Sequence, residues 1–339
     1  MTRFHNTLFV TQAKSCLRKE GETLHLLREG AAKVQVPLHH LRSVVCFGRV
    51  RVTPGAMHAC AQAGVTLTFL SPGQGRFLAR VEGPTPRTAT LRRAQYAACN
   101  DGARALQLAR SFVLGKIANK RTLVMRAART RPQGRDALKR LAARLQALGD
   151  RCCEAPALDV LRGVEGEAAS RYFAAFDKLV GPSAFTFDGR TRRPPRNPLN
   201  ALLSFGYALL SGDCIAALEA AGLDPAVGLL HCERSGRPAL ALDLMEEFRA
   251  PLVDRLVLAL IRRKQVQVKD FETQPSGAVY LKDDKRRWFI AEYQRQKQEE
   301  RQHPSVQQRV PWALIPHLQA VSLARTLRGE GDYLPFLAR

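Results

Sequence analysis

The sequence predicts an α+β protein in which a β-rich amino-terminal domain, residues 1–86, precedes a mainly α-helical domain, residues 87–339. Three observations lead to this prediction. The first ninety residues contain short runs with strand periodicity, and the later residues place apolar side chains at helical spacing. A chain of 339 residues is also too long for a single hydrophobic core. Between the two parts, residues 81–86 are rich in Pro and Gly and are expected to form a linker.

Strands are expected in the first domain where β-branched and aromatic residues run together between turn residues. Residues 43–47 form a continuous apolar run that is typical of a strand buried on both faces, and 65–70 is the clearest strand of the chain. Residues 15–27 read as a hairpin broken at Glu20-Gly21. Further strands are expected at 7–10 and 33–36, and a short Ala-rich helix at 54–63.

Helices are expected in the second domain where apolar residues recur every three or four positions. The first and longest is marked by Leu106, Ala109, Val113, Ile117 and Val124. The next covers 138–148, and Gly149 is expected to end it. Later helices are expected at 161–176, 197–212, 214–221, 240–264, 282–302 and 316–327.

The charge of the chain predicts a polyanionic partner. Lys and Arg number 53 against 30 Asp and Glu, so the formal charge is +23. This excess indicates nucleic acid first and an anionic membrane surface second, while the 45% hydrophobic content excludes a disordered basic protein. The longest apolar run, 199–210, is far shorter than the ~20 residues that span a bilayer. An amphipathic helix with exposed aromatic residues, which would favour a membrane surface, is not recognised either, so no membrane partner is expected.

The cysteines and the amino terminus predict a cytoplasmic protein. The eight cysteines contain no Cys-x-x-Cys pair, which argues against a structural zinc site. No apolar stretch of signal-peptide length follows Met1, so a disulfide framework is not expected either. Reduced thiols are the ordinary interpretation.

Basic residues concentrate in the first long helices. Residues 101–145 hold twelve Lys and Arg against two acidic side chains, whereas a merely solvated face usually mixes both signs. We therefore favour phosphate contacts there over a solvated surface. The Pro-rich loop 188–198 adds four arginines and is either a clamp that orders on DNA or a disordered loop. The DNA-binding candidates are Arg126, Arg129, Lys139, Arg190, Arg192, Arg193, Arg234 and Arg237.

Two isolated polar residues lie in unusual surroundings. Glu165 stands between Gly163 and Gly166, which are poor helix-interior residues. They fit a backbone that passes close to another group, or a helix start, where a surface carboxylate is ordinary. His231 follows two leucines, and such a histidine is more often a satisfied core residue than a ligand.

A third polar group lies inside an apolar helical pattern. Asp243 shares a helix face with Glu246 and Glu247, where like charges repel. These carboxylates require a compensating cation. It is either a divalent metal or one of the arginines 234, 237, 249 and 255.

Four motifs in this order resemble the CRISPR-associated protein one family, the integrase/endonuclease of spacer acquisition. They are residues 163–166, 200–210, 222–225 leading to Leu230-His231, and 236–249. Each is weak alone, but the four together at these separations are highly specific, and the resemblance spans nearly the whole chain. The ending from Val310-Pro311-Trp312 to Pro335-Phe336 is most similar to the branch associated with type I-C systems.

The resemblance implies a metal-binding triad of Glu165, His231 and Glu246, with Asp243 as a residue that orients the site. Some relatives carry aspartate where this chain has Glu246. Two carboxylates and an imidazole suit Mg²⁺ or Mn²⁺ and leave positions open for water and phosphate oxygens. The implied activity is a metal-dependent DNA endonuclease and integrase that inserts foreign DNA fragments as new spacers into a CRISPR array, by attack of a DNA 3′-hydroxyl or water on a phosphodiester.

The resemblance also implies double-stranded DNA, both fragment and CRISPR repeat, as a partner. It further implies a homodimer and a small ferredoxin-like second CRISPR-associated protein. We place the dimer contact in the strands of residues 1–85, with an internal core as the alternative use of their apolar residues. The alternative function is a catalytically silent basic scaffold that only holds nucleic acid. A scaffold has no reason to retain Glu165, His231 and Glu246 together.

Overall fold

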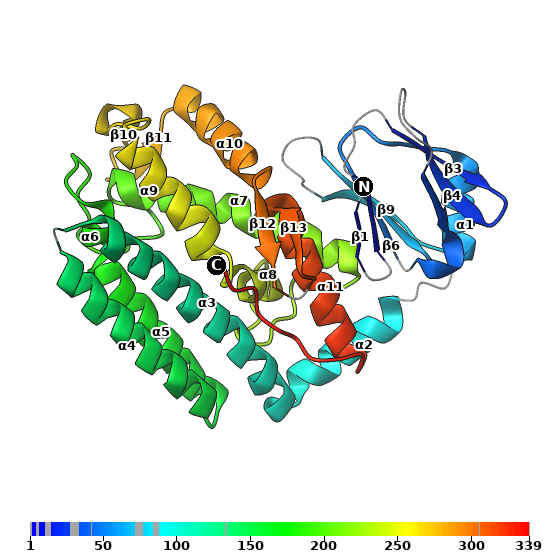
Figure 1. Ribbon diagram of the computed structural model, residues 1–339, viewed down its shortest axis with the longest axis horizontal. Coiled ribbons are helices and arrows are strands. Elements are labelled where there is room, and N and C mark those ends of the chain that lie inside the picture. Colours follow the sequence, from blue (N-terminus) through cyan, green and yellow to red (C-terminus); the bar gives the residue numbers. More distant parts are fainter. Residues whose placement is uncertain are drawn as a thin grey trace.

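The structure is a computed structural model that describes residues 2–4, 7–10, 15–27, 34–41, 43–71, 77–83, 88–132, 134–304 and 306–338. A β-rich amino-terminal part is followed by a mostly helical part, which confirms the predicted fold class (Figure 1). The predicted linker at 81–86 lies between strand β9 and helix α2, and its residues 84–86 are outside the described ranges. The domain boundary itself stays a prediction.

The described residues of the amino-terminal part form two sheets, one α-helix and a short 3₁₀ helix, Leu38–His40. The five-stranded sheet has the order β1-β2-β6-β8-β9, in which β2, β6 and β8 are parallel neighbours, and the four-stranded sheet has the order β5-β4-β3-β7. The strands are β1 (Thr2–Phe4), β2 (Thr7–Val10), β3 (Cys16–Glu20), β4 (Thr23–Leu27), β5 (Val34–Pro37), β6 (Ser43–Phe47), β7 (Arg51–Val52), β8 (Thr66–Leu70) and β9 (Phe77–Val81). Helix α1 covers Pro54–Gln62, and the Thr53 side chain caps its start by accepting the Ala56 N–H at 3.3 Å.

The central strands bury both faces within the chain, because alternate side chains point to opposite sides of the sheet. Val44 and Leu67 join a core shared with the four-stranded sheet and α1. Val45 and Leu70 point the other way, into the core of the helical part. Strand β8, one of the strands of residues 1–85 in which we place the dimer contact, therefore packs internally on both faces, and the dimer contact itself stays a prediction.

The helical part contains α2 (Thr88–Asn100), α3 (Gly102–Thr130), α4 (Arg135–Glu154), α5 (Leu158–Ala174), α6 (Phe176–Val180), α7 (Pro198–Ala221), α8 (Ala239–Met245), α9 (Arg255–Arg262), α10 (Asp283–Lys297) and α11 (Ile315–Leu327). Two short hairpins interrupt it, formed by β10 (Phe271–Thr273) with β11 (Val279–Leu281) and by β12 (Glu300–His303) with β13 (Gln308–Pro311). The helices α3, α4 and α5 lie side by side along one side of the molecule (Figure 1).

Several helix boundaries differ from those predicted, among them the expected helix 282–302, which ends at Lys297 and is followed by strand β12. Gly149 does not end α4, which continues to Glu154 because Cys152 still packs in the core. The expected helices 197–212 and 214–221 are one helix, α7, which ends at Gly222 with a φ of +83°. The expected helix 240–264 is broken after Met245 and continues as a π-helical segment, Arg249–Asp254, before α9.

Helix α7 is the center of the helical core. Among the described residues it is the one helix long and apolar enough to cross a membrane by length and composition. Most of it is buried, however, and it packs against α8, α11 and the five-stranded sheet. Its polar residues are engaged as well, since Asp213 accepts hydrogen bonds from Tyr293 at 2.7 Å and from Lys297 at 2.6 Å.

The junction between the two parts contains a buried histidine, His317 of α11. Its ring packs in a T-shaped geometry on Phe9 and Phe47 of the five-stranded sheet. The ring centroids are 5.9 Å apart for Phe9 and 5.0 Å apart for Phe47. Burial, assisted by Lys297, lowers the pKa of His317 to about 3 from 6.5. The neutral, buried imidazole therefore contributes stability that is fully present above pH 6.5 and is lost as the pH falls toward 3.

We expect this junction to make the protein acid-sensitive. Between pH 6.5 and 4.5 the lowered pKa of His317 is expected to reduce the free energy of unfolding by roughly 2–3 kcal/mol, at about 1.36 kcal/mol per pH unit. The variant His317→Leu is expected to lose that much less stability than the native chain over this interval. Denaturant unfolding at the two pH values measures the difference, and equal losses in both proteins would contradict the assignment.

Candidate active site

Four segments converge on the polar group that the motifs indicated. Glu165 lies in the middle of α5, and His231 lies in the loop between α7 and α8. Asp243 is in α8, and Glu246 follows its last residue. Helix α3 contributes Lys116, whose side chain is 6% exposed.

Asp243 holds the histidine loop in place. Its fully buried carboxylate accepts the backbone N–H groups of Leu229 at 2.6 Å and Leu230 at 3.0 Å. It also accepts the backbone N–H of His231 at 3.0 Å and lies 2.6 Å from the Nδ1 atom of that ring. His231 is thereby oriented with Nε2 as its free ring nitrogen. Carboxylates hold metal-ligating histidines in this way.

The two glutamates of the predicted triad meet on one ammonium group. Lys116 Nζ lies 2.6 Å from Glu246 Oε2 and also contacts Glu165 Oε1. Arg249 Nε lies 3.0 Å from the other oxygen of Glu246. Burial alone would raise the pKa of Glu246, but Arg249, Lys116 and His231 outweigh it and hold that pKa below its usual range. The compensating cations are therefore a lysine and one of the four arginines considered.

The three carboxylates of residues 243–247 do not oppose one another as the helix-face argument implied. The helix ends after Met245, and each carboxylate turns to different partners. Glu247 points to the carboxyl-terminal segment, where it accepts hydrogen bonds from the Tyr333 hydroxyl at 2.5 Å and the Phe336 N–H at 2.7 Å. Burial raises the pKa of Glu247 to about 8 despite these bonds.

A second buried layer lies beneath the site, and sequence reasoning missed it. Lys120, one helical turn after Lys116, lies over the rings of Tyr172 at 4.6 Å and Phe173 at 5.2 Å. Burial and the nearby Lys116 lower the pKa of Lys120 to about 7. Asp254 accepts hydrogen bonds from Tyr172 at 2.8 Å and from Tyr207 at 2.5 Å.

A π-helical segment connects these buried residues to the site. Asp254 closes the π-helical segment, a kind of irregularity that is frequent at functional sites. Arg249 opens the same segment and lies over the Tyr207 ring at 4.6 Å. The π-helical segment therefore connects Glu246 to Tyr207, because Arg249 forms an ion pair with Glu246 and lies over the Tyr207 ring.

The surface beside Glu165 is open. A Cβ atom added to Gly163 or Gly166 would meet no other atom within 4 Å, and both glycines are exposed. The expected helix start is wrong, since α5 begins earlier at Leu158, and the expected close approach of the backbone to another group stays a prediction. The glycines instead leave room for a bulky substrate next to the carboxylate.

The residues have the chemistry of a divalent metal site. In the described part of the chain, however, no three or more His, Cys, Asp or Glu side chains already lie close enough together to hold a metal ion. The donor set is two carboxylates and an oriented imidazole. The space between the carboxylates holds the positive charge of Lys116. A bound metal would take over this charge.

The DNA-binding candidates fall into two groups. Arg126, Arg129 and Lys139 are exposed, as phosphate contacts require. Arg192, Arg193 and Arg234 are also exposed. Arg237 is half-buried and lines a loop cavity of about 730 Å³.

Arg190 forms hydrogen bonds within the protein, and the contact of its loop with DNA stays a prediction. Its guanidinium donates to Asn200 Oδ1 at 2.8 Å and to Ser204 Oγ at 3.0 Å, both on α7. Asn200 in turn donates to the Gly189 carbonyl at 2.8 Å. These hydrogen bonds therefore fix Arg190 and its loop to α7.

Comparison with known proteins identifies relatives over the whole chain. The family model described as CRISPR associated protein Cas1 matches residues 8–295. A CRISPR-associated endonuclease Cas1 from Moorella thermoacetica is 46% identical over 339 residues, covering 98% of each chain. Another from Chlorobaculum tepidum is 46% identical over 344 residues and covers all of both chains.

Solved structures share the fold at lower sequence identity. A casposase bound to integration product superposes with a TM-score of 0.80 at 21% identity, covering 97% of both chains. A Cas1 protein from Thermotoga maritima has a TM-score of 0.75 at 23% identity and covers 97% of this chain and 98% of its own. These likenesses establish the arrangement of a β-rich part before a helical part.

Proposed function

Because this chain belongs to the Cas1 family of CRISPR-associated proteins, we propose that Glu165, His231 and Glu246 form the catalytic centre of a metal-dependent DNA endonuclease and integrase. Its relatives of 46% identity are named endonucleases, and the chain is a nuclease of that class. It inserts foreign DNA fragments as new spacers into a CRISPR array. The casposase neighbour, captured with an integration product, supports strand joining as well as cleavage.

One observation carries this proposal: two glutamates from separate segments share a buried cation beside a histidine that is oriented for ligation. Gathering two carboxylates at one buried point costs free energy. A catalytically silent scaffold gains nothing from that cost, so this arrangement favours the enzyme over the alternative function.

Glu165, His231 and Glu246 would hold the divalent metal that such nucleases and integrases require, and we propose Mg²⁺ or Mn²⁺. When bound, the metal would polarise the scissile phosphate and lower the pKa of the attacking oxygen. The open surface at Gly163 and Gly166 admits the DNA backbone beside Glu165. Asp243 keeps the proton of His231 at Nδ1, so that Nε2 stays available.

A cleavage and strand-joining assay on short DNA tests this proposal. Metal depletion by a chelator is expected to abolish both reactions, and Mn²⁺ or Mg²⁺ is expected to restore them. Reactions that proceed at full rate in the chelator would refute the metal-dependent mechanism.

We also propose that phosphate contacts to α3 and α4 supply much of the DNA affinity. Reversing the charges of Arg126, Arg129 and Lys139 together is expected to flatten the plot of log K against log salt. Each lost phosphate contact removes about 0.9 from that slope, so the loss is up to about three such steps. Titrations at several salt concentrations measure it, and an unchanged slope would mean that these helices face solvent or another subunit.

The proposed assembly is a homodimer that also binds the small ferredoxin-like second CRISPR-associated protein. Two strand-joining events need two sites, and one chain carries one. A Cas6-RT-Cas1–Cas2 complex is among the solved neighbours and supports the second partner. In the described part of the amino-terminal domain, Leu78 is the exposed large apolar side chain, 60% exposed on the edge strand β9. We place the dimer contact at this edge.

Light scattering at micromolar concentration is expected to give about twice the 37.6 kDa of one chain. Leu78→Glu is expected to weaken the dimer about tenfold or more, because burying a leucine is worth about 1.5–3 kcal/mol. Leu334→Glu changes a leucine of the same exposure in the carboxyl-terminal segment and serves as the control. A monomeric native chain with full joining activity would contradict the dimer.

Two further assignments remain proposals. We place the protein in the cytoplasm and, within its family, in the type I-C branch. The second rests on the ending of the chain, where the rings of Trp312 and Phe336 pack 5.3 Å apart. The position of the gene beside type I-C effector genes would test it.

A further inference from the structure

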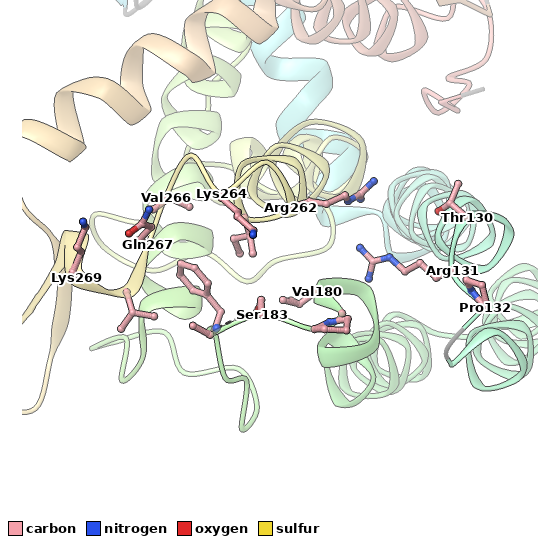
Figure 2. Close-up of a pocket in the computed structure, with 16 residues that line it drawn as sticks. Thr130, Arg131, Pro132, Val180, Ser183, Arg262, Lys264, Val266, Gln267 and Lys269 are labelled. Carbon is pink, nitrogen blue, oxygen red and sulfur yellow. Dashed lines mark hydrogen bonds between the residues drawn. The ribbon is translucent and has the colours of Figure 1, made fainter.

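A cavity of about 790 Å³ lies away from the catalytic residues, between the ends of two helices and the segment after α6 (Figure 2). The end of α3 contributes residues 130–132 and the end of α9 with its following loop contributes 261–269. Part of its wall is apolar, with Val180, Ile261 and Val266 buried there. Such a volume and such a wall suit a small organic group.

The charged residues of this cavity are all cations. Arg131, Arg262, Lys264 and Lys269 are among its lining residues, and none of the lining residues carries a carboxylate. Within the described ranges these four side chains form no ion pair. Arg131 and Arg262 extend toward each other from opposite sides (Figure 2). Burial and then Arg262 lower the pKa of Arg131, as expected for two close guanidinium groups without a shared anion.

Lys264 has a strained backbone at this place. Its φ is +56°, a conformation that residues other than glycine rarely adopt. It is the left-handed residue that closes the end of α9, where the Gln265 N–H donates to the Leu260 carbonyl at 3.0 Å and the Lys264 N–H to the Ile261 carbonyl at 2.9 Å. This turn sets a lysine on the wall of the cavity, directly after α9 ends.

Two helices connect the cavity to the catalytic residues. Lys116 and Arg131 are fifteen residues apart along α3, or about 22 Å at 1.5 Å per residue. Helix α9 begins directly after Asp254 and ends at Arg262 on the cavity. Between them the positive charge continues, because Arg126 of α3 lies close enough to Arg255 of α9 to contribute to its lowered pKa, after burial and Arg301.

We propose that this cavity binds an unpaired nucleotide of the DNA substrate, with the base against the apolar wall and its phosphates on Arg131, Arg262 and Lys264. The inference rests on the proposed DNA substrate. An apolar cavity ringed by cations complements a planar base attached to an anionic backbone. The base must be unpaired, because a stacked base pair cannot leave the duplex to enter a cavity. The path from the catalytic residues is at most about six nucleotides, because ~3.4 Å per nucleotide is the spacing of a stacked duplex strand and an unpaired strand can extend further.

The test uses duplexes with single-stranded tails of either polarity that carry 2-aminopurine at successive positions, in the presence of a chelator. For one polarity, we expect a fluorescence change confined to one position or two adjacent positions of the tail. An abasic nucleotide at that position is expected to weaken binding at least about fivefold, the lower range of base stacking. No position-dependent signal, or no cost of the abasic nucleotide, would overturn the proposal.

Two variants separate binding from folding. Arg262→Glu is expected to remove both the fluorescence change and the abasic cost, whereas Arg287→Glu, an exposed arginine of α10 outside the cavity, is expected to leave them unchanged. Lys264→Gly relieves the strained φ, so it is expected to raise the melting temperature while it weakens tail binding. Unchanged tail binding in both Arg262→Glu and Lys264→Gly would overturn the proposal.

The outcomes also separate this proposal from the proposed function. Chelator-sensitive cleavage of blunt duplex without a signal from the tail would overturn the nucleotide site alone. A tail signal without metal-dependent cleavage would overturn the catalytic assignment alone. Equal fluorescence changes with a free mononucleotide at the same concentration would show that the cavity takes nucleotides apart from a DNA strand, and would also overturn the proposal.

Discussion

Glu165→Ala, His231→Ala and Glu246→Gln are each expected to abolish metal-dependent DNA cleavage and strand joining. Removing even a residue behind a metal ligand usually costs 10–100-fold in metal affinity or activity, and removing a ligand costs at least as much. Glu165 and His231 are about one-quarter exposed, so their replacement by alanine is expected to leave the fold intact. For Glu246, glutamine is the better choice, because a smaller residue would leave Lys116 and Arg249 buried beside an empty space.

The measurement is the rate of Mn²⁺-dependent cleavage and joining, with thermal unfolding to verify folding. Asp159→Asn changes an exposed carboxylate on the same helix as Glu165 and is expected to retain near-native rates. Full activity in Glu165→Ala or His231→Ala would remove that residue from the catalytic centre.

Lys116→Met is expected to have opposite effects on the metal-free and metal-bound protein. Without metal, Glu165 and Glu246 lose their shared cation, and breaking such a buried pair costs about 3–5 kcal/mol. With metal, no ammonium has to be displaced, so Mn²⁺ is expected to bind at least about tenfold more tightly. Removing the repulsion of one unit charge about 4 Å from the metal is worth about 4 kcal/mol at an effective dielectric constant of about 20, which is more than a tenfold gain in affinity requires. Calorimetric titration and the rise in melting temperature with Mn²⁺ measure both effects.

A matched control exists elsewhere in the core. Lys297 is another buried lysine, paired with Asp213 at 2.6 Å and lying over the Tyr293 ring at 5.6 Å. Lys297→Met is expected to destabilise the protein similarly but to leave Mn²⁺ affinity unchanged. If Lys116→Met binds Mn²⁺ no more tightly than the native chain, Lys116 does not occupy the position of the metal.

The sequence was most informative where packing and local propensity agree. The strands at 7–10, 43–47 and 66–70 are present because β-branched residues suit both the strand conformation and a sheet buried on both faces. The helix break after Met245 was not predicted, since the apolar pattern continues through Leu252 and Val253 while the hydrogen bonding changes to π-helical. Periodicity reports which side chains are buried and not which backbone bonds form.

The sequence indicated the acidic residues of this cluster and Arg249, but it did not indicate the buried lysines. Lys116 and Lys120 were counted with the exposed cations of α3, but both are buried. The signal was in the sequence, because helical spacing places them on the same face as Val113, Ile117 and Val124. A cation on an apolar stripe implies a buried anion. Tertiary partners such as Tyr333 for Glu247, 86 residues apart, have no comparable local signal.

The most direct test of the catalytic centre is the anomalous density of Mn²⁺ in crystals of the native protein. We expect one peak in contact with a carboxylate oxygen of Glu165, a carboxylate oxygen of Glu246 and Nε2 of His231, with the Lys116 ammonium displaced from between the two glutamates. A peak elsewhere, or Lys116 still bridging Glu165 and Glu246 at saturating Mn²⁺, would contradict the assignment.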